Sequence, residues 1–450
     1  MCITTPRTPL TFGWFLNFMP PAWNGPWRSN HRDRWTDGDF YVDVARQLEA
    51  ACIDFMLLED SVMVPDTYGG TMEAELTYTT RAPKGDPLPL IPKLARATSH
   101  IGFAATMSTS LYPPFMLARL LTTLDHITHG RVAWNLVTSA EDRAAQNFGK
   151  AGLPSHAERY ERADEYAALV KQLWNSWDEG ALVMDRTEGR YVDHTKVHPI
   201  NFEGQFHSSR GPLNTLPGPQ RQPLIFQAGS SPAGRDLAAK HAEVVLASMK
   251  GVDQMKAFRD DIRARAAAAG RDPDSIKVLY LIQPIIAETE EEAQLRAARA
   301  YAPTDDNVIA RLVHMSSGDV DFSQFDLDAP LPDDIETNGI KSGIDNLRRV
   351  AAGKTLREAA ASRMEAVSLV GTAESVADQI DAVVAEVGGD GFIFFGGGGG
   401  KLSRHYVAEI TEGLMPALQD RGLARTHYPA DTLRNSIFPT ATTNALEPTR

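Results

Sequence analysis

Residues 101–139 read IGFAATMSTSLYPPFMLARLLTTLDHITHGRVAWNLVTS and contain one full period of a pattern that runs through the chain. A short apolar run at 101–106 is followed by a helical pattern at 115–127 and by a second apolar run at 131–136. Short apolar runs that alternate with longer helical patterns are typical of parallel βαβ units. We therefore expect two parallel strands here, joined by a crossover helix.

The same alternation extends outward from this stretch in both directions. Strands are expected at 10–16, 53–58, 101–106, 131–136, 223–227, 243–247, 277–283 and 391–395. Helices are expected at 40–51, 88–99, 115–127, 158–178, 233–241, 252–269, 290–301, 372–387 and 405–420. Eight strands, each followed by a helix, predict an α/β fold of the TIM (β/α)8 barrel type. An open doubly wound sheet is the alternative, because a strand count from one sequence is easily wrong by one.

Two long stretches do not fit the repeat. We expect a single barrel over residues 1–435, with insertions on the catalytic face near 139–222 and 302–366, and a C-terminal tail at 436–450. The second insertion is polar and acidic, which favours either a mobile lid or a solvated structural excursion. The tail after Asp431 shows little periodicity, so we expect it to wrap the surface or to fray.

Composition excludes several classes of function. The chain has 450 residues, and its 58 acidic against 45 basic side chains give a net charge of −13, which opposes nucleic-acid binding. Its 2 cysteines cannot form a disulfide framework or a cysteine metal site, which fits a reducing, cytoplasmic setting. We expect no signal peptide and no membrane span, since no apolar stretch reaches about 18 residues.

Polar residues stand near the ends of three predicted strands. Asp60, Thr106 and Asn135 occupy these positions. In a barrel the carboxyl ends of the strands surround the active site, so these side chains would face its mouth. The alternative is ordinary turn chemistry, in which Asp60 caps the following segment.

Two segments could hold a phosphate. Ser230 and Ser231 follow Gly229 and precede a proline at a predicted helix start, where backbone N–H groups and hydroxyls suit one phosphate. The order G-x-G-x-x-G of a dinucleotide site is absent, and an ordinary helix cap is the alternative. His156 and Tyr160 stand four residues apart on one helix face, where they could donate to a phosphate or serve only in packing.

Other reaction classes have little support. The histidines show no H-E-x-x-H spacing, so we expect no catalytic metal, and no G-x-S-x-G nucleophile elbow occurs. The five glycines at 396–400 could approach a ligand or form a flexible connector. A reaction carried out by a bound cofactor is therefore the simplest interpretation of the sequence.

Several short motifs of the sequence together carry a resemblance to a known protein family. They are LLEDS at 57–61, YPP at 112–114, TLDHITHGR at 123–131, WNLVTS at 134–139, NFG at 147–149, His156 with ERY at 158–160, LWNSW at 173–177, RGPL at 210–213, QAGSS at 227–231 and LQDRG at 418–422. Together they resemble the flavin-dependent monooxygenases of the nitrilotriacetate and dibenzothiophene-sulfone monooxygenase group, within the bacterial-luciferase-like superfamily. The resemblance spans about residues 10–435.

The resemblance implies a TIM-type barrel that binds FMN in its reduced form, FMNH2, supplied by a separate NAD(P)H:flavin reductase. O2 would be the co-substrate, and one oxygen atom would enter a small-molecule substrate. The family's FMN contacts would fall on Asp60, Thr106, His156, Tyr160, Ser230 and Ser231. The catalytic candidates are Asn135, near the flavin ring, and His314, in a lid at 314–325. We also expect a homo-oligomer, a dimer or a tetramer.

Substrate identity is less constrained. The segment 12–23 is unusually aromatic, and Phe12, Trp14, Met19 and Trp23 are candidate substrate contacts. Position 140 is Ala, where similar alkane-oxidising enzymes carry His. These departures favour an apolar substrate that is aromatic, halogenated or organosulfur; alternatively, the rings plug the barrel or a subunit contact. An F420-dependent dehydrogenase of the same superfamily and a non-catalytic flavin-binding barrel are the alternative functions.

Overall fold

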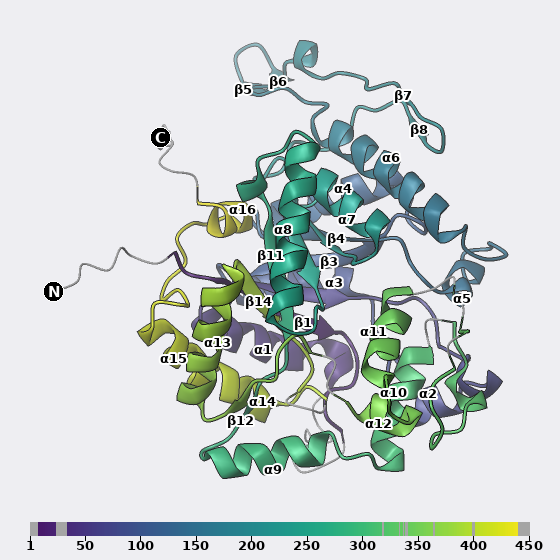
Figure 1. The fold of residues 1–450 in the computed structure, drawn as a ribbon. Coiled ribbons are helices and arrows are strands. Elements are labelled where there is room, and N and C mark those ends of the chain that lie inside the picture. The colour runs from purple at the N-terminus through teal and green to yellow at the C-terminus, as the bar shows by residue number, and fades with distance from the viewer. Residues whose placement is uncertain are drawn as a thin grey trace.

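The computed structural model describes residues 8–23, 34–316, 319–332, 334–335, 337, 341–362, 365–397 and 401–439. Eight parallel strands form a closed barrel inside a ring of helices (Figure 1). The barrel strands are β1 (Thr11–Asn17), β2 (Phe55–Glu59), β3 (Gly102–Ser108), β4 (Val132–Val137), β9 (Leu224–Ala228), β10 (Val244–Ala247), β11 (Lys277–Ile282) and β14 (Gly391–Phe394). Because β1 pairs with β14 and closes the barrel, the TIM-barrel prediction is confirmed and the open-sheet alternative is wrong.

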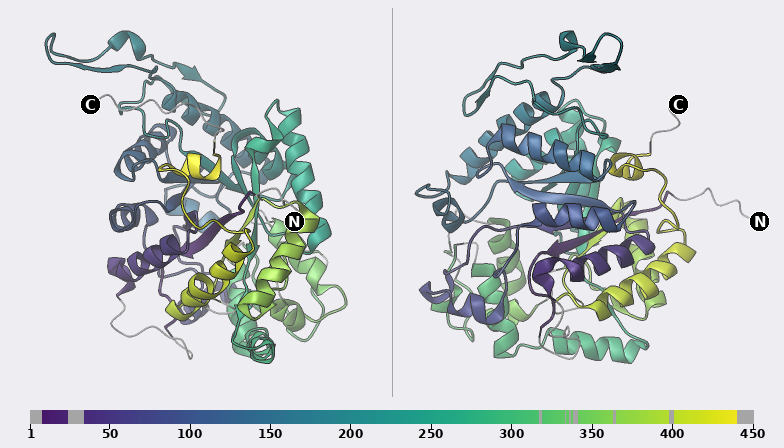
Figure 2. Two further views of the ribbon diagram at one scale, coloured as in Figure 1. Left: turned by 90° about the vertical axis from the view of Figure 1, so that its left-hand side faces the viewer. Right: turned by 180° about the vertical axis from the view of Figure 1, so that it is seen from behind.

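Helices surround the barrel on all sides (Figure 2). They are α1 (Asp39–Ala50), α2 (Glu73–Tyr78), α3 (Pro87–Ala97), α4 (Pro114–Ile127), α5 (Asp142–Gln146), α6 (His156–Trp174), α7 (Pro232–His241), α8 (Val252–Ala268), α9 (Glu290–Ala300), α10 (Asp305–Ser316), α11 (Lys341–Ala351), α12 (Leu356–Ala361), α13 (Ala373–Val387), α14 (Arg404–Ala408), α15 (Met415–Asp420) and α16 (Leu433–Ile437). A π-helical segment at Glu409–Leu414 joins α14 to α15.

Both faces of each barrel strand are apolar, because one faces the helices and the other faces the barrel interior. On β1, Phe12 and Trp14 pack in the outer core, which includes residues of the surrounding helices. Gly13 and Phe15 face inward, and a Cβ atom on Gly13 would lie 2.2 Å from the ring of Phe55, so that ring occupies the space a side chain would need. The alternation of β1 therefore decides which aromatic side chains can reach a ligand.

The stretch at 139–222 leaves the barrel and returns to it. It contains α5, α6 and two small antiparallel sheets, β5 (Leu182–Asp185) with β6 (Arg190–Val192) and β7 (Phe202–Glu203) with β8 (Ser208–Ser209). These hairpins project away from the barrel (Figures 1 and 2). Leu182, Met184 and Tyr191 are exposed there.

The stretch at 302–366 contains a folded helical unit of α10, α11 and α12 with its own apolar core. Val308 and Leu312, four residues apart on α10, are fully buried in this core together with Phe322. α10 packs against α2. The expected lid is thus a packed unit in its described part, because apolar residues at helical spacing lie within the acidic sequence; residues 317–318 of the predicted lid lie outside the described residues.

The expectation that the tail wraps the surface or frays is wrong for residues 433–437. Leu433 and Ile437 of α16 are buried among the inward-facing residues of the barrel strands and fill its amino-terminal end. Gly102, at the start of β3, leaves room for them, since a Cβ there would lie 2.4 Å from the Leu433 side chain. The rest of the predicted tail, residues 440–450, lies outside the described residues.

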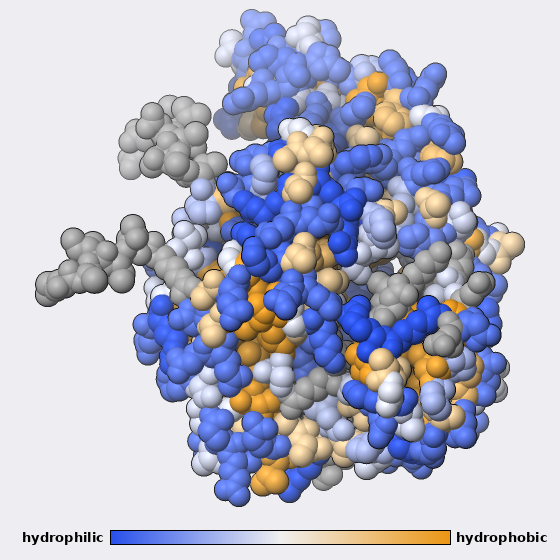
Figure 3. All heavy atoms as spheres, in the orientation of Figure 1, coloured by the Kyte–Doolittle hydropathy of each residue, from blue (hydrophilic) through white to orange (hydrophobic). Residues whose placement is uncertain are grey.

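The face of the molecule in Figure 3 is mostly hydrophilic, and its apolar residues form separate groups. Among the described residues, no helix combines the length and the apolar character needed to cross a membrane. The same described residues contain no cluster of three or more His, Cys, Asp or Glu side chains placed to hold a metal ion.

Candidate active site

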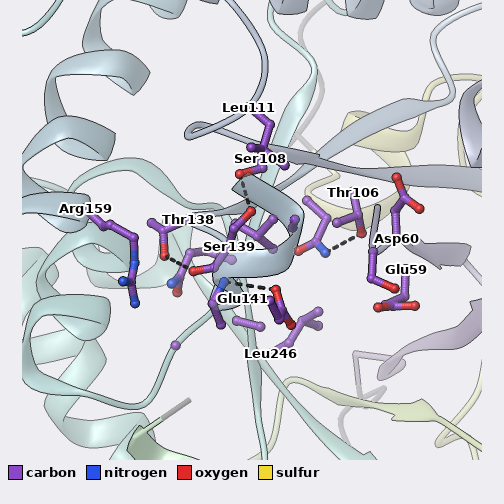
Figure 4. Close-up of a pocket in the computed structure, with 18 of the residues that line it drawn as sticks. Glu59, Asp60, Thr106, Ser108, Leu111, Thr138, Ser139, Glu141, Arg159 and Leu246 are labelled. Carbon is purple, nitrogen blue, oxygen red and sulfur yellow. Dashed lines mark hydrogen bonds between the residues drawn. The ribbon is translucent and has the colours of Figure 1, made fainter. Parts of the chain in front are cut away.

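A cavity of about 400 Å3 opens at the carboxyl ends of the barrel strands. Such a volume is within the range of small-molecule and cofactor sites. Seven polar residues singled out from the sequence line this one cavity: Asp60, Thr106, Asn135, His156, Tyr160, Ser230 and Ser231. In Figure 4, Arg159 lies at one side of the cavity, and Glu59 and Asp60 lie at the other.

A hydrogen-bonded pair stands in the middle of the cavity wall. Thr106 and Asn135 are register partners on β3 and β4, and Asn135 Nδ2 donates to Thr106 Oγ1 over 2.8 Å. Both side chains are buried. Asn135 Oδ1 and Gln227 Oε1 are buried without a hydrogen-bond partner among the described residues. Because an unmet buried acceptor is costly, these two oxygens point to a ligand that carries N–H donors.

The loop between β9 and α7 forms one end of the cavity. Ser231 caps α7, and its hydroxyl accepts a hydrogen bond from the Gly234 amide over 3.1 Å. Gly229 lies so close that a Cβ on it would be 3.2 Å from the Gly234 backbone and 2.4 Å from the Gln227 amide nitrogen. This close approach holds hydroxyls and backbone N–H groups at the positive end of a helix, where an anion is favoured.

The first turn of α6 lines the same cavity. The rings of His156 and Tyr160 lie 4.8 Å apart, as four-residue spacing on a helix predicts. Arg159 between them is 2% exposed, lines the cavity, and donates from Nη1 to the carbonyl of Pro154 over 2.9 Å. Burial lowers the pKa of Arg159 below its usual value, but a guanidinium keeps its charge at neutral pH. A fixed positive charge therefore stands in the wall of the cavity that the serine loop also lines.

The opposite end of the cavity is charged. Glu59 forms an ion pair with Lys84, and this pair and Arg81 hold the pKa of Glu59 below its usual value despite burial. Asp60 differs, because burial raises its pKa to about 7; Glu59 adds to this effect and Lys84 opposes it. Asp60 can therefore be neutral near physiological pH and donate a hydrogen bond.

His314 does not line the cavity, although we expected it to be catalytic. It lies on α10, beside Arg81 and Glu59 at the charged end. Its ring is accessible to solvent, yet the atoms packed around it and the positive charge of Arg81 lower the pKa of His314. No described residue between 302 and 366 lines the cavity, so the predicted lid does not enclose it here.

The structure does not bring the predicted substrate contacts to the cavity. Phe12 is 1% exposed and stacks on Phe394 in the outer core, and Trp14 is fully buried there. Met19 is buried outside the cavity lining, and Trp23 is 48% exposed and donates to Thr79 Oγ1. The assignments of Phe12 and Trp14 are therefore corrected, because their side chains point outward from β1 into the outer core. Met19 and Trp23 lie outside the residues that line the cavity.

Several lining residues were missed by sequence reasoning. They are Phe15, Arg81, Glu141, Arg159 and Gln227. Phe15 would have been predicted if the opposite alternation of inward and outward side chains had been assigned to β1. Gln227 and Arg159 stand inside the motifs that carried the family resemblance, so those motifs already contained a signal for them.

Comparison with known proteins agrees with this geometry. The family model described as luciferase-like monooxygenase matches residues 10–391. Dibenzothiophene-sulfone monooxygenase of Rhodococcus erythropolis is 34% identical over 431 residues, covering 92% of this chain and 93% of that protein. Nitrilotriacetate monooxygenase component A of Aminobacter aminovorans is 36% identical over 432 residues, with the same two coverages.

A solved structure of riboflavin lyase, crystallised with modified FMN and the substrate riboflavin, superposes with a TM-score of 0.86 at 30% identity. The alignment covers 96% of both chains. The matching family model, the two full-length relatives and the shared barrel agree, and the chain therefore belongs to the luciferase-like monooxygenase family.

Proposed function

We propose that this monooxygenase uses reduced FMN, received from a separate NAD(P)H:flavin reductase, to transfer one oxygen atom of O2 to a small-molecule substrate. The observation that supports the proposal is that Ser230, Ser231, His156 and Tyr160 all line a single cavity. Relatives named for a "component A" and a riboflavin lyase structure holding a modified FMN support both the cofactor and the partner.

The cavity suits FMN at both ends of that molecule. At the serine loop, hydroxyls, amides and the Arg159 guanidinium would hold the phosphate, because each donates to an anion and the close glycines leave space for it. In the middle, the free oxygens of Asn135 and Gln227 would accept from the N–H groups of the ring. The donor set therefore fits the cofactor.

Bound reduced flavin supplies the reaction with O2, and the protein supplies orientation and a partly apolar wall. Thr106 and Asn135, which are joined by a hydrogen bond, would hold the flavin ring against the barrel wall. Phe15, Leu246 and Leu281 line the same cavity and limit the access of water from the barrel interior. His314 would act only from the edge of the charged end, where it lies beside Arg81.

Two alternatives make different predictions. An F420-dependent dehydrogenase would bind the deazaflavin in preference to FMN, and a non-catalytic flavin barrel would bind FMN without forming product. Titration with both cofactors, followed by a product screen by mass spectrometry with a reductase and air, separates these cases. The screen would include sulfones, chlorinated aromatics and aminopolycarboxylates.

Removing two phosphate donors should weaken cofactor binding. We expect Ser230→Ala combined with Tyr160→Phe to raise the Kd for reduced FMN at least about 10-fold, because each hydrogen bond to a charged group contributes about 1.5–3 kcal/mol. Anaerobic calorimetric titration measures this. Ser208→Ala with Tyr191→Phe, on the distant hairpins, is the matched control. An unchanged Kd in the first variant would show that the phosphate lies elsewhere.

The purified chain should need a reductase. No dinucleotide fingerprint is present in the sequence, so we expect no NADH consumption with FMN and O2 alone, and consumption coupled to product once a flavin reductase is added. Absorbance of NADH measures both. Rapid NADH oxidation by the chain without a reductase would contradict the two-component assignment.

A further inference from the structure

The charged end of the cavity holds side chains that the proposed flavin contacts do not use. Arg81 lies there, with Glu59 and Glu141 on either side, and all three line the cavity. Arg81 Nη1 is 3.8 Å from one oxygen of each glutamate, which is too long for a hydrogen bond. These charges form ion pairs with one another, but an apolar substrate would leave the hydrogen-bond donors of Arg81 unmet.

Arg81 has donors to spare. Its side chain is 15% exposed, and it donates no hydrogen bond to any residue that the structure describes. Its Nε atom is buried and likewise has no hydrogen-bond partner among the described residues. A guanidinium offers five N–H donors, and leaving them unmet in a buried setting is costly.

The two carboxylates are already engaged. Glu59 accepts a hydrogen bond from Lys84, which also donates to Ser61 Oγ over 3.0 Å. Glu141 accepts from the amide of Ala140 over 3.1 Å. The unmet capacity on this wall therefore belongs to a donor, and the partner that it lacks is an acceptor.

The Arg81 backbone is held in place before any ligand binds. Glu75, 2% exposed on α2, accepts from the Arg81 amide over 2.6 Å and from the Ala82 amide over 2.8 Å. The same carboxylate accepts from the Thr80 hydroxyl over 2.5 Å. A side chain that projects from a fixed backbone loses less freedom when it binds a ligand.

We propose that Arg81 binds an oxyanion of the substrate, in its simplest form a carboxylate, and so selects acidic substrates for this enzyme. The planar guanidinium matches a carboxylate with two parallel hydrogen bonds. Charge permits it, since Lys84 and Arg81 balance Glu59 and Glu141. The inference rests on the proposed function in one respect, namely that substrate and flavin share this cavity.

The names of the relatives do not decide between an acidic and an uncharged substrate. Of the two relatives described above, one is named for nitrilotriacetate, an acid, and the other for dibenzothiophene sulfone, which carries no charge. The expectation of an apolar aromatic substrate rests on the segment 12–23 and on Ala140. Phe12, Trp14, Met19 and Trp23 lie outside the cavity lining, whereas Ala140 belongs to it. The cavity wall itself favours a compound with an acidic group.

Paired probes test the proposal without knowledge of the natural substrate. Hexanoate, benzoate and (methylthio)acetate are each titrated beside their primary amides at one ionic strength, by calorimetry, against the FMN-free protein and the anaerobic FMN-loaded protein. We expect at least one acid to bind about 10-fold or more tightly than its amide. Arg81→Gln should abolish that preference, whereas Arg81→Lys should keep part of it.

Two further variants sharpen the result. Glu141→Gln should tighten binding of the acids and leave the amides unchanged, because it removes a competing carboxylate. Arg186→Gln, on an exposed hairpin turn, is the matched control and should change neither. Equal binding of every acid and its amide by the wild type would overturn the proposal, as would an acid preference that survives Arg81→Gln. If reduced FMN fails to bind the wild type, the proposed function fails, but the FMN-free titrations still decide the role of Arg81.

Discussion

Replacing Leu433 and Ile437 together by alanine is expected to lower the free energy of unfolding by about 4–8 kcal/mol, since each buried leucine or isoleucine cut to alanine costs about 2–5 kcal/mol and the two share one cavity. Both side chains are at most 1% exposed inside the amino-terminal end of the barrel. Denaturant unfolding followed by circular dichroism measures the loss.

The control for this pair is Leu295→Ala on α9, where the leucine is 53% exposed and little change is expected. Leu433→Met, which conserves volume, should cost less than about 1.5 kcal/mol. A double variant as stable as the wild type would show that α16 does not fill the barrel in solution. The proposed FMN site lies at the other end of the strands, so cofactor affinity should persist wherever the double variant remains folded.

Trp14→Ala is expected to lower the free energy of unfolding by about 3–5 kcal/mol while leaving the affinity for reduced FMN unchanged. The indole is fully buried, and its ring lies 5.6 Å from that of Phe394 and 5.8 Å from that of Tyr406. The cavity that the substitution leaves would lie between β1 and the outer helices.

Phe15→Ala is the companion variant, because Phe15 is adjacent in sequence but faces the opposite side and lines the active-site cavity. It should weaken the binding of flavin or raise the ratio of H2O2 to oxygenated product, with a smaller loss of stability. Calorimetric titration, denaturant unfolding and a peroxide assay separate the two outcomes. A Trp14→Ala protein that is fully stable but releases more H2O2 would show that Trp14 contacts the substrate and does not stabilise the outer core.

The barrel could be predicted from the sequence because each strand is a short apolar run between helical patterns. Which side chains of β1 point into the barrel could not be predicted. Phe12, Trp14 and Phe15 are all aromatic, and a strand buried on both sides shows no polar alternation. Thr106 and Asn135 could be predicted because a polar residue at the end of an apolar run is conspicuous.

Other parts were hidden for different physical reasons. Arg159 lies among charged residues at the start of a helix, a pattern that usually indicates solvent exposure, and only the fold places it against the cavity. In the stretch at 302–366, Val308 and Leu312 carry the helical spacing, but the surrounding acidic residues mask it. The pairing of Arg81 with two glutamates depends on contacts with residues 22 and 60 positions away in the chain, which no local pattern reports.

Closure of the barrel joins Thr11 of β1 to Gly391 of β14, about 380 residues later in the chain. At a synthesis rate of roughly 5–20 residues per second, β1 emerges from the ribosome about 20–80 seconds before the strand that completes its pairing. Throughout that interval an apolar strand presents unpaired N–H and C=O groups, which is the kind of edge that recruits other chains. The topology thus leaves one edge of β1 open to pairing with other chains until β14 has been synthesised.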